Sequence, residues 1–282
     1  PSGGLILYSS AAGGVSVAAL FMGGYLTGIS LGVAVAIVAV ALAVKMGYKK
    51  SEIEEKDPAW KVWVDAIPAL LAVVIVMGGI LTGKFTATEA GVVMVLYCGL
   101  LAVVYREMNL KTLYELLADT MKGSATILFL IASSSIMSYV MSYTGIPAAI
   151  SSGLMSVSDN RYILLLIMNV FLLIMGMFLD LTPAVLIFTP VFLPIARSIG
   201  MSDVHFGLML IMNLVIGSVT PPVGSVLFVG CGVGKVKIEG VTRYILPMFV
   251  AMVAALFLVT YIPAIPLIVP YLCKLVPSFW WN

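Results

Sequence analysis

Residues 217–224 read GSVTPPVG and lie between two short apolar segments. Two adjacent prolines remove backbone donors and clash with a continuing helix, so the chain must unwind there. Unwound backbone in a membrane exposes carbonyl oxygens, and these are the ligands that coordinate sodium in such places. Gly217, Thr220 and Val223 can supply carbonyls, and Thr220 adds a hydroxyl. The sequence therefore predicts a cation site at this break.

A second break is expected at 176–183 (GMFLDLTP), where Pro183 disfavours helix at the residue before it. The flanking apolar segments are each predicted to be too short to cross a bilayer alone: 162–175 and 184–195. We expect a re-entrant helical hairpin over 161–198. The alternative, one kinked helix, would exceed the usual length of a membrane span. Gly176 and the tip beside it would then complete the oxygen shell of the cation.

Asp180 is the one acidic residue within this apolar surrounding. A charge at the bilayer centre costs roughly 2.5–3.5 kcal/mol on insertion scales, so we expect Asp180 to meet a cation, a partner or water. Coordination and simple solvation both stay open at this point. The residues expected to line the site flank the two breaks: Asp180, Thr182, Pro183, Pro221 and Pro222.

The elements that must hold these breaks are membrane helices. Apolar residues make up 62% of the 282, charged residues only 10%, and the mean hydropathy is +1.15. Soluble domains average about 45–50% apolar and about 25% charged residues. The sequence has no basic stripe with interleaved aromatics, which argues against nucleic acid as a partner. It has no metal-ligand spacing, nucleophile–base pair or phosphate loop either, so we expect no enzyme.

Apolar segments long enough to span a bilayer recur along the chain. The expected spans are 15–44, 64–82, 89–105, 123–142 and 244–262. The charged segment 45–61 is predicted to be a cytoplasmic loop, and 106–121 an amphipathic helix at the membrane interface. With 45–61 inside, eleven Lys and Arg residues fall on the cytoplasmic side and four outside, which fits the positive-inside rule.

The start of the chain is similar to a later stretch. Residues 1–7 (PSGGLIL) align without gaps with 222–228 (PVGSVLF), and at the same offset Val17 falls on Ile238. The expected number of crossings between the copies gives them opposite orientations, as in the inverted repeats of secondary transporters. The first residues contain neither an initiator Met nor a signal peptide. We therefore expect an interior cut in a longer chain that falls inside the first broken helix, so that the first repeat lacks its hairpin and the first half of that helix.

Several motifs together resemble one family, the large membrane subunit (DctM/SiaM-like) of tripartite ATP-independent periplasmic (TRAP) transporters. They occur in the order of that family: GKFTATEA at 83–90, GMFLD at 176–180, HFG at 205–207 and GSVTPPVG at 217–224. Lys84 and Ala87 depart from the expected pattern, which has an apolar residue and a proline there. Neither position belongs to the predicted site.

The resemblance implies an all-α, polytopic protein of the bacterial inner membrane, from the ion-transporter superfamily, that works by an elevator mechanism. The implied transport domain comprises 1–44 and 161–282, and the scaffold comprises 62–158 with its interfacial arm helix at 106–121. Within the second repeat the implied elements are a hairpin at 161–198, a discontinuous helix at 204–233 and a last helix at 243–270.

The resemblance also implies sodium-coupled import of an organic acid of the sialic acid or dicarboxylate class. A periplasmic binding protein would deliver the substrate, and a small membrane subunit would be a second partner. The implied sodium ligands are Gly176, Gly217, Thr220 and Val223, and the repeat makes Ser2 the candidate for a second site. Two alternatives stay open: a symporter of the same superfamily that needs no binding protein, and a structural membrane subunit.

Overall fold

The computed structural model describes residues 2–47, 58–146, 149–150, 152–153, 160–221 and 224–280. These residues form helices and connecting turns, with no strand among them. Seven helices in the described part of the chain are long and apolar enough to cross a membrane. The all-α polytopic class predicted from composition is therefore confirmed.

The chain folds into two compact units, Pro1–Met46 with Ile127–Asn282, and Gly47–Thr126. The larger unit contains α1 (Gly3–Ala11), α2 (Val17–Lys45), α7 (Arg161–Phe178), α8 (Leu181–Ser198), α9 (Asp203–Ser218), α10 (Ser225–Gly234), α11 (Ile238–Tyr261) and α12 (Ala264–Leu272). The smaller unit contains α3 (Ala59–Leu81) and α4 (Ala87–Val104). Helix α5 (Leu110–Thr144) runs through the boundary.

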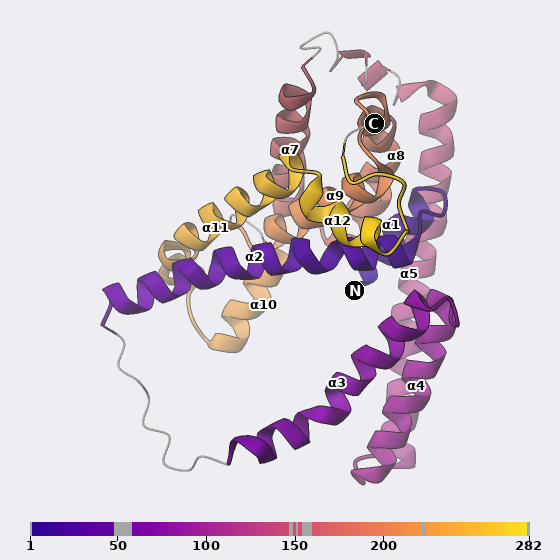
Figure 1. Cartoon of the computed structure of the whole chain (residues 1–282), viewed down its shortest axis with the longest axis vertical. Helices are drawn as coiled ribbons and strands as arrows, with labels where there is room; N and C mark the ends of the chain where they lie inside the picture. Colours follow the sequence, from indigo (N-terminus) through magenta and orange to yellow (C-terminus); the bar gives the residue numbers. More distant parts are fainter. Residues whose placement is uncertain are drawn as a thin grey trace. The chain divides into compact units, whose positions relative to one another are not determined.

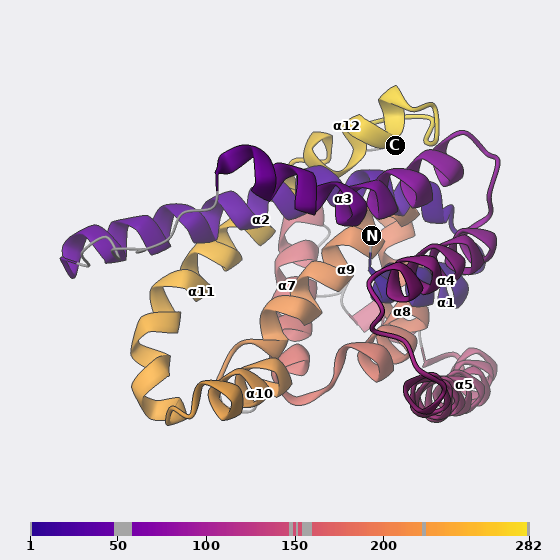
Figure 2. The same cartoon turned by 90° about the horizontal axis from the view of Figure 1, so that it is seen from below.

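Helix α9 is the centre of the larger unit, packed against α1, α2, α7, α8, α11 and α12 (Figures 1 and 2). All its residues are buried except Asp203 and Val215. Ser202 caps its start by accepting a hydrogen bond from the His205 amide at 3.2 Å. The fully buried Tyr8 of α1 donates its hydroxyl to the Asp203 carbonyl at 2.7 Å. The start of α9 is therefore fixed both locally and by α1.

Two helices, α7 and α8, occupy 161–198 as predicted, and only Leu179 and Asp180 join them. The predicted break at 176–183 was too wide. Pro183 lies in the first turn of α8, where the missing N–H would have had no helical partner. Each helix has 18 residues and counts among the seven candidate spans, so the prediction that both pieces are too short to cross was wrong.

The predicted discontinuous helix is also present: α9 ends at Ser218 and α10 begins at Ser225. Gly224 immediately before α10 has φ of 36°, in the left-handed region that glycine adopts without strain. Its amide donates to the Met177 carbonyl at 3.1 Å, so the break is tied to the end of α7.

Two other predicted boundaries were wrong. The interfacial helix at 106–121 and the span at 123–142 form one continuous helix, α5, because a single glycine between them costs a helix only about 1 kcal/mol. The last helix predicted at 243–270 divides into α11 and α12 at Pro263, where the ring clashes with a continuing helix. Residues 48–57 of the predicted cytoplasmic loop lie outside the described residues.

The repeat seen in the sequence extends to the helix boundaries. Val17 is the first residue of α2, and its aligned partner Ile238 is the first residue of α11. Each of these helices follows a short one, α1 or α10, and the turns before them contain residues with positive φ, Gly13 (86°) and Lys235 (51°). Both copies therefore consist of a short helix, a turn and a long helix that begins at the aligned position.

In the smaller unit a short turn joins α3 to α4. Thr86 and Glu89 form a capping box at the start of α4, in which the Glu89 carboxylate accepts from the Thr86 amide at 2.8 Å. The Tyr97 hydroxyl donates to the Pro68 carbonyl at 2.8 Å and ties the two helices together. Much of the 83–90 motif is therefore explained by the needs of this turn.

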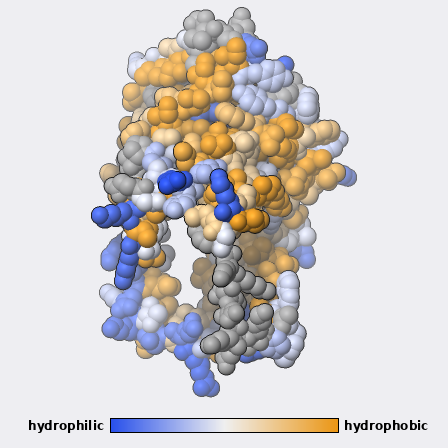
Figure 3. Space-filling model, turned by 90° about the vertical axis from the view of Figure 1, so that its left-hand side faces the viewer, coloured by the Kyte–Doolittle hydropathy of each residue, from blue (hydrophilic) through white to orange (hydrophobic). Residues whose placement is uncertain are grey.

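Apolar side chains also cover much of the outside. On α2 the exposed residues Ile29, Val33, Ile37 and Val40 recur at helical spacing and form one face. Figure 3 shows apolar side chains over large areas of the face that it views. Such exposure suits a lipid environment, since soluble proteins rarely expose large contiguous apolar areas.

Close packing at Gly23 allows α2 to lie against α9 and α12, and we expect Gly23→Ala to destabilise the protein. The added Cβ would lie 2.5 Å from both Leu208 Cδ1 and the Pro266 carbonyl oxygen, and overpacking of this kind costs about 1–3 kcal/mol. Gly28→Ala in the same helix is the matched control, since a Cβ there meets nothing within 4 Å. The thermal unfolding midpoint in detergent should fall for the first variant and stay or rise for the second. Equal midpoints would contradict this packing.

Candidate functional site

Helices α7 and α9 touch near their carboxyl ends, where each has a glycine. A Cβ added to Gly217 would lie 2.6 Å from the carbonyl carbon of Gly176 and 2.7 Å from its Cα. A Cβ added to Gly176 would lie 3.1 Å from the Cα of Leu214. No side chain fits at this contact without a backbone shift, so only glycines allow it. The structure thus brings together two residues predicted for the cation site from separate elements.

Thr220 lies two residues after the end of α9 and is 5% exposed. Its hydroxyl donates to the Ile216 carbonyl at 2.6 Å, and its amide donates to the Gly217 carbonyl at 2.9 Å. Both bonds go to carbonyls in the last turn of α9, and the Ile216 carbonyl also accepts from the Val219 amide at 3.3 Å. The hydroxyl oxygen keeps lone pairs that can accept a donor or bind a cation.

Carbonyl oxygens approach one another around Gly224. A Cβ built on Gly224 would lie 2.7 Å from the carbonyl oxygen of Thr220 and 3.0 Å from that of Ser218. One backbone oxygen from the end of α9 and one from the unwound segment therefore flank a residue whose own amide is bonded to the Met177 carbonyl. This arrangement can offer oxygen ligands from the break close to the end of α7.

Asp180 lies at the hairpin turn, where it is exposed and accepts a hydrogen bond from the Ser225 hydroxyl at 3.4 Å. It is the residue before α8, and Ser225 is the first residue of α10. The amino ends of helices carry partial positive charge, which favours a carboxylate beside them. The sequence left both coordination and simple solvation open for Asp180. In the structure its side chain is exposed and has the Ser225 hydroxyl as a partner.

The other predicted residues divide into three groups. Thr182, Pro183 and Pro221 are half-buried at the same two breaks. Pro222 and Val223 lie outside the described residues. Ser2 caps α1 by accepting from the Leu5 amide at 3.4 Å, and no hydrogen bond within the described part of the chain joins it to Gly176 or Gly217.

Sequence reasoning missed a buried polar cluster that connects α7, α9 and α11. Asn169, Asn213 and Thr260 are all fully buried, and Asn213 donates its side-chain amide to the Asn169 oxygen at 2.7 Å. Asn213 lies one turn before Gly217 on α9, and Asn169 lies two turns before Gly176 on α7. Asparagines in otherwise apolar helices, at helical spacing from the two glycines, were the signal that could have revealed this cluster.

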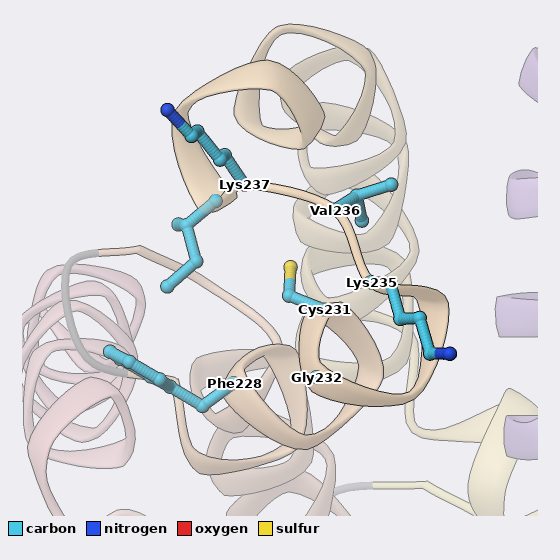
Figure 4. Close-up of a pocket in the computed structure, with 7 residues that line it drawn as sticks. Phe228, Cys231, Gly232, Lys235, Val236 and Lys237 are labelled. Atoms are coloured by element: carbon cyan, nitrogen blue, oxygen red, sulfur yellow. The ribbon is translucent and has the colours of Figure 1, made fainter.

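The described residues contain no cluster of three or more acidic, histidine or cysteine side chains that would make a second kind of metal site. A cavity of about 660 Å³ lies at the α10–α11 turn, lined by Phe228, Cys231, Gly232, Lys235, Val236, Lys237 and Ile238. Figure 4 shows the ammonium groups of Lys235 and Lys237 pointing away from each other, so they do not converge on one ligand. No predicted site residue lines this cavity.

Comparison with known proteins agrees with the family suggested by the motifs. The family model described as "Tripartite ATP-independent periplasmic transporter, DctM component" matches residues 1–265. The uncharacterized protein YgiK of Salmonella typhimurium is 44% identical over 272 residues, which are 96% of this chain and 62% of that protein.

Two other relatives carry functional names. The C4-dicarboxylate TRAP transporter large permease protein DctM of Rhodobacter capsulatus is 33% identical, over 91% of this chain and 59% of that protein. The sialic acid TRAP transporter large permease protein SiaM of Vibrio cholerae is 33% identical, over 96% of this chain and 64% of that protein. The chain thus spans about three fifths of the length of these relatives.

The family match and the seven apolar helices together identify a multi-pass protein of the bacterial inner membrane. The hairpin, the broken helix and the glycine contact that joins them occupy the matched region. The chain belongs to the DctM family, the large membrane components of TRAP transporters.

Proposed function

We propose that this chain forms part of the permease of a sodium-coupled secondary transporter that imports an organic acid. The observation that carries the proposal is the glycine contact between α7 and α9 beside unwound backbone with converging carbonyls. The names of the relatives from Rhodobacter capsulatus and Vibrio cholerae support a dicarboxylate or sialic acid as the substrate class. Both are organic anions, and their import can be driven by a co-transported cation.

The proposed sodium site uses neutral oxygens: the carbonyls of Gly176, Gly217, Thr220 and Val223 and the Thr220 hydroxyl. Gly176 and Gly217 lie in the last turns of α7 and α9, where each helix end carries about half a negative charge. Two such ends meeting at one place attract a cation. A monovalent hard ion suits a set of dipoles, whereas a divalent ion usually takes carboxylate ligands as well.

Sodium binding would also prepare the site for an anionic substrate. The amino ends of α8 and α10 lie at the same two breaks, but Asp180 already places a carboxylate beside them. A second carboxylate arriving from a substrate would be repelled unless positive charge is present nearby. The cation supplies that charge, so substrate affinity should depend on sodium. This linkage is the electrostatic basis of the proposed coupling.

A periplasmic binding protein delivers the substrate, and a small membrane subunit assembles with the permease. Residues 1–44 and 161–282 move as the transport domain against the scaffold at 62–158, in an elevator motion. The Gly224–Met177 hydrogen bond joins the hairpin to the broken helix, which supports their movement as one body.

A larger side chain at the contact between Gly176 and Gly217 should weaken sodium binding. In Gly217→Ala the new Cβ would lie 2.6 Å from the carbonyl carbon of Gly176, so α7 and α9 must separate and their carbonyls with them. We expect the sodium concentration for half-maximal uptake to rise about tenfold or more, equivalent to about 1.4 kcal/mol. Gly230→Ala on α10, where a Cβ meets nothing within 4 Å, should leave it unchanged. Wild-type sodium dependence in Gly217→Ala would contradict the site.

Thr220→Ala should weaken sodium affinity several-fold, because it removes a proposed ligand and the hydrogen bond to the Ile216 carbonyl at 2.6 Å. A hydrogen bond of this kind contributes about 0.5–1.5 kcal/mol. Thr220→Ser keeps the hydroxyl and should retain most of the affinity. The measurement is uptake as a function of external sodium in proteoliposomes. If Ala and Ser behave alike, the hydroxyl is no ligand.

Uptake by the intact transporter tests the function as a whole. We expect uptake of sialic acid or C4-dicarboxylates into proteoliposomes to require both an inward sodium gradient and the cognate binding protein. Full uptake without the binding protein would favour the independent symporter instead. No transport, together with thermal stability that does not change with sodium, would favour a structural membrane subunit.

A further inference from the structure

The seam between α7 and α9 contains more than the glycine contact. Asn213, one turn before Gly217 on α9, faces Asn169, which lies two turns before Gly176 on α7. Thr260 of α11 donates a hydrogen bond to Asn169 and completes the cluster. All three residues have no exposed surface. The cluster is therefore cut off from bulk water, and each of its polar atoms needs a partner inside the protein.

The hydrogen bonds fix which way both amides point. The Asn213 Nδ2 donates to the Met209 carbonyl at 2.9 Å and to Asn169 Oδ1 at 2.7 Å. The Asn169 Nδ2 donates to the Leu165 carbonyl at 2.7 Å. Flipping either amide would set an oxygen against a carbonyl oxygen, so the orientations shown are the only ones with matched donors and acceptors.

One side-chain oxygen of the cluster lacks a hydrogen-bond partner among the described residues. Asn169 Oδ1 accepts from Asn213 and, at 3.3 Å, from the Thr260 hydroxyl. Asn213 Oδ1 is buried and accepts no hydrogen bond from any of the described residues. A buried acceptor without a partner is destabilising, and native proteins rarely leave one in that state.

We propose that Asn213 Oδ1 anchors a second small-ligand site inside the α7–α9 seam, occupied by one water molecule or one sodium ion. The ligand must present positive charge or a hydrogen-bond donor to an amide oxygen. It must also be small, because α9 is buried along nearly its whole length. The Thr260 hydroxyl, which donates to Asn169 Oδ1 at 3.3 Å, keeps lone pairs of its own. Both occupants satisfy the same chemistry.

The proposed site is separate from the sodium site at the breaks. None of Gly176, Gly217, Thr220 or Val223 contributes to it, and it does not depend on the proposed transport function. Its position one turn along α9 from Gly217 places a bound ligand where it holds α7, α9 and α11 in register. Loss of the ligand would therefore loosen the helices that carry the glycine contact.

The decisive measurement is a density map of the intact protein in lipid nanodiscs, at a resolution that shows ordered water. Maps are compared in sodium buffer and in choline buffer. We expect a peak at hydrogen-bond distance from Asn213 Oδ1 in both buffers if the ligand is water. A peak in sodium buffer alone identifies the ion. Absence of a peak in both buffers overturns the proposal.

Two variants supply the controls. Asn213→Leu removes the anchoring oxygen and should lose the peak, whereas Thr260→Val keeps that oxygen and should retain it. Retention of the peak in Asn213→Leu would also overturn the proposal. If Asn213→Leu does not fold, the wild-type and Thr260→Val maps still decide. Sodium-dependent uptake is measured separately, so failure of the transport function and absence of this ligand are distinguishable.

Discussion

Two helices of this protein end against each other, and they can do so only because each has a glycine at the contact. The backbones of Gly176 and Gly217 are too close for any side chain, and each residue lies within the last three of its helix. The contact therefore joins two carboxyl ends, each with about half a negative charge. Such like charges repel more strongly in a medium of low dielectric constant than in water. Nearby hydrogen-bond donors or positive charge must therefore offset this repulsion.

Hydrogen-bond donors of the protein offset part of the repulsion between these two helix ends. The amide and hydroxyl of Thr220 satisfy carbonyls of α9, and the Gly224 amide satisfies a carbonyl of α7. The amino ends of α8 and α10 come to the same place and face Asp180. Positive and negative helix ends thus alternate within a few residues. A cation bound there would neutralise the negative partial charge that these donors leave uncompensated.

The sequence predicted the breaks well because proline and glycine act locally. The adjacent Pro221 and Pro222 both lack a backbone donor and disfavour a continuing helix, and α9 and α10 are separate there. Boundaries were less predictable, since Pro183 is tolerated in a first turn and Gly123 in a helix interior. Neither position carries a local signal strong enough to decide.

Contacts between distant segments were the part that sequence reasoning could not supply. Nothing in the composition of α7 and α9 pairs Gly176 with Gly217, or Asn169 with Asn213, because these contacts depend on how the two helices cross. The asparagines were visible as polar residues in apolar helices. Their hydrogen-bond partners, and the acceptor left over at Asn213, required the three-dimensional arrangement.

The repeat has a consequence for how such duplications are recognised. Tyr8 of α1 is fully buried against α9, whereas Val229, its aligned counterpart on α10, is 68% exposed. The two copies therefore share where their helices begin and turn, but not what they touch. Selection for packing would change the buried side chains of the two copies first and would leave their helix starts and turn glycines in place. Duplications in membrane proteins should then be sought by comparing turn glycines and helix starts, because backbone geometry fixes these positions more than side-chain contacts do.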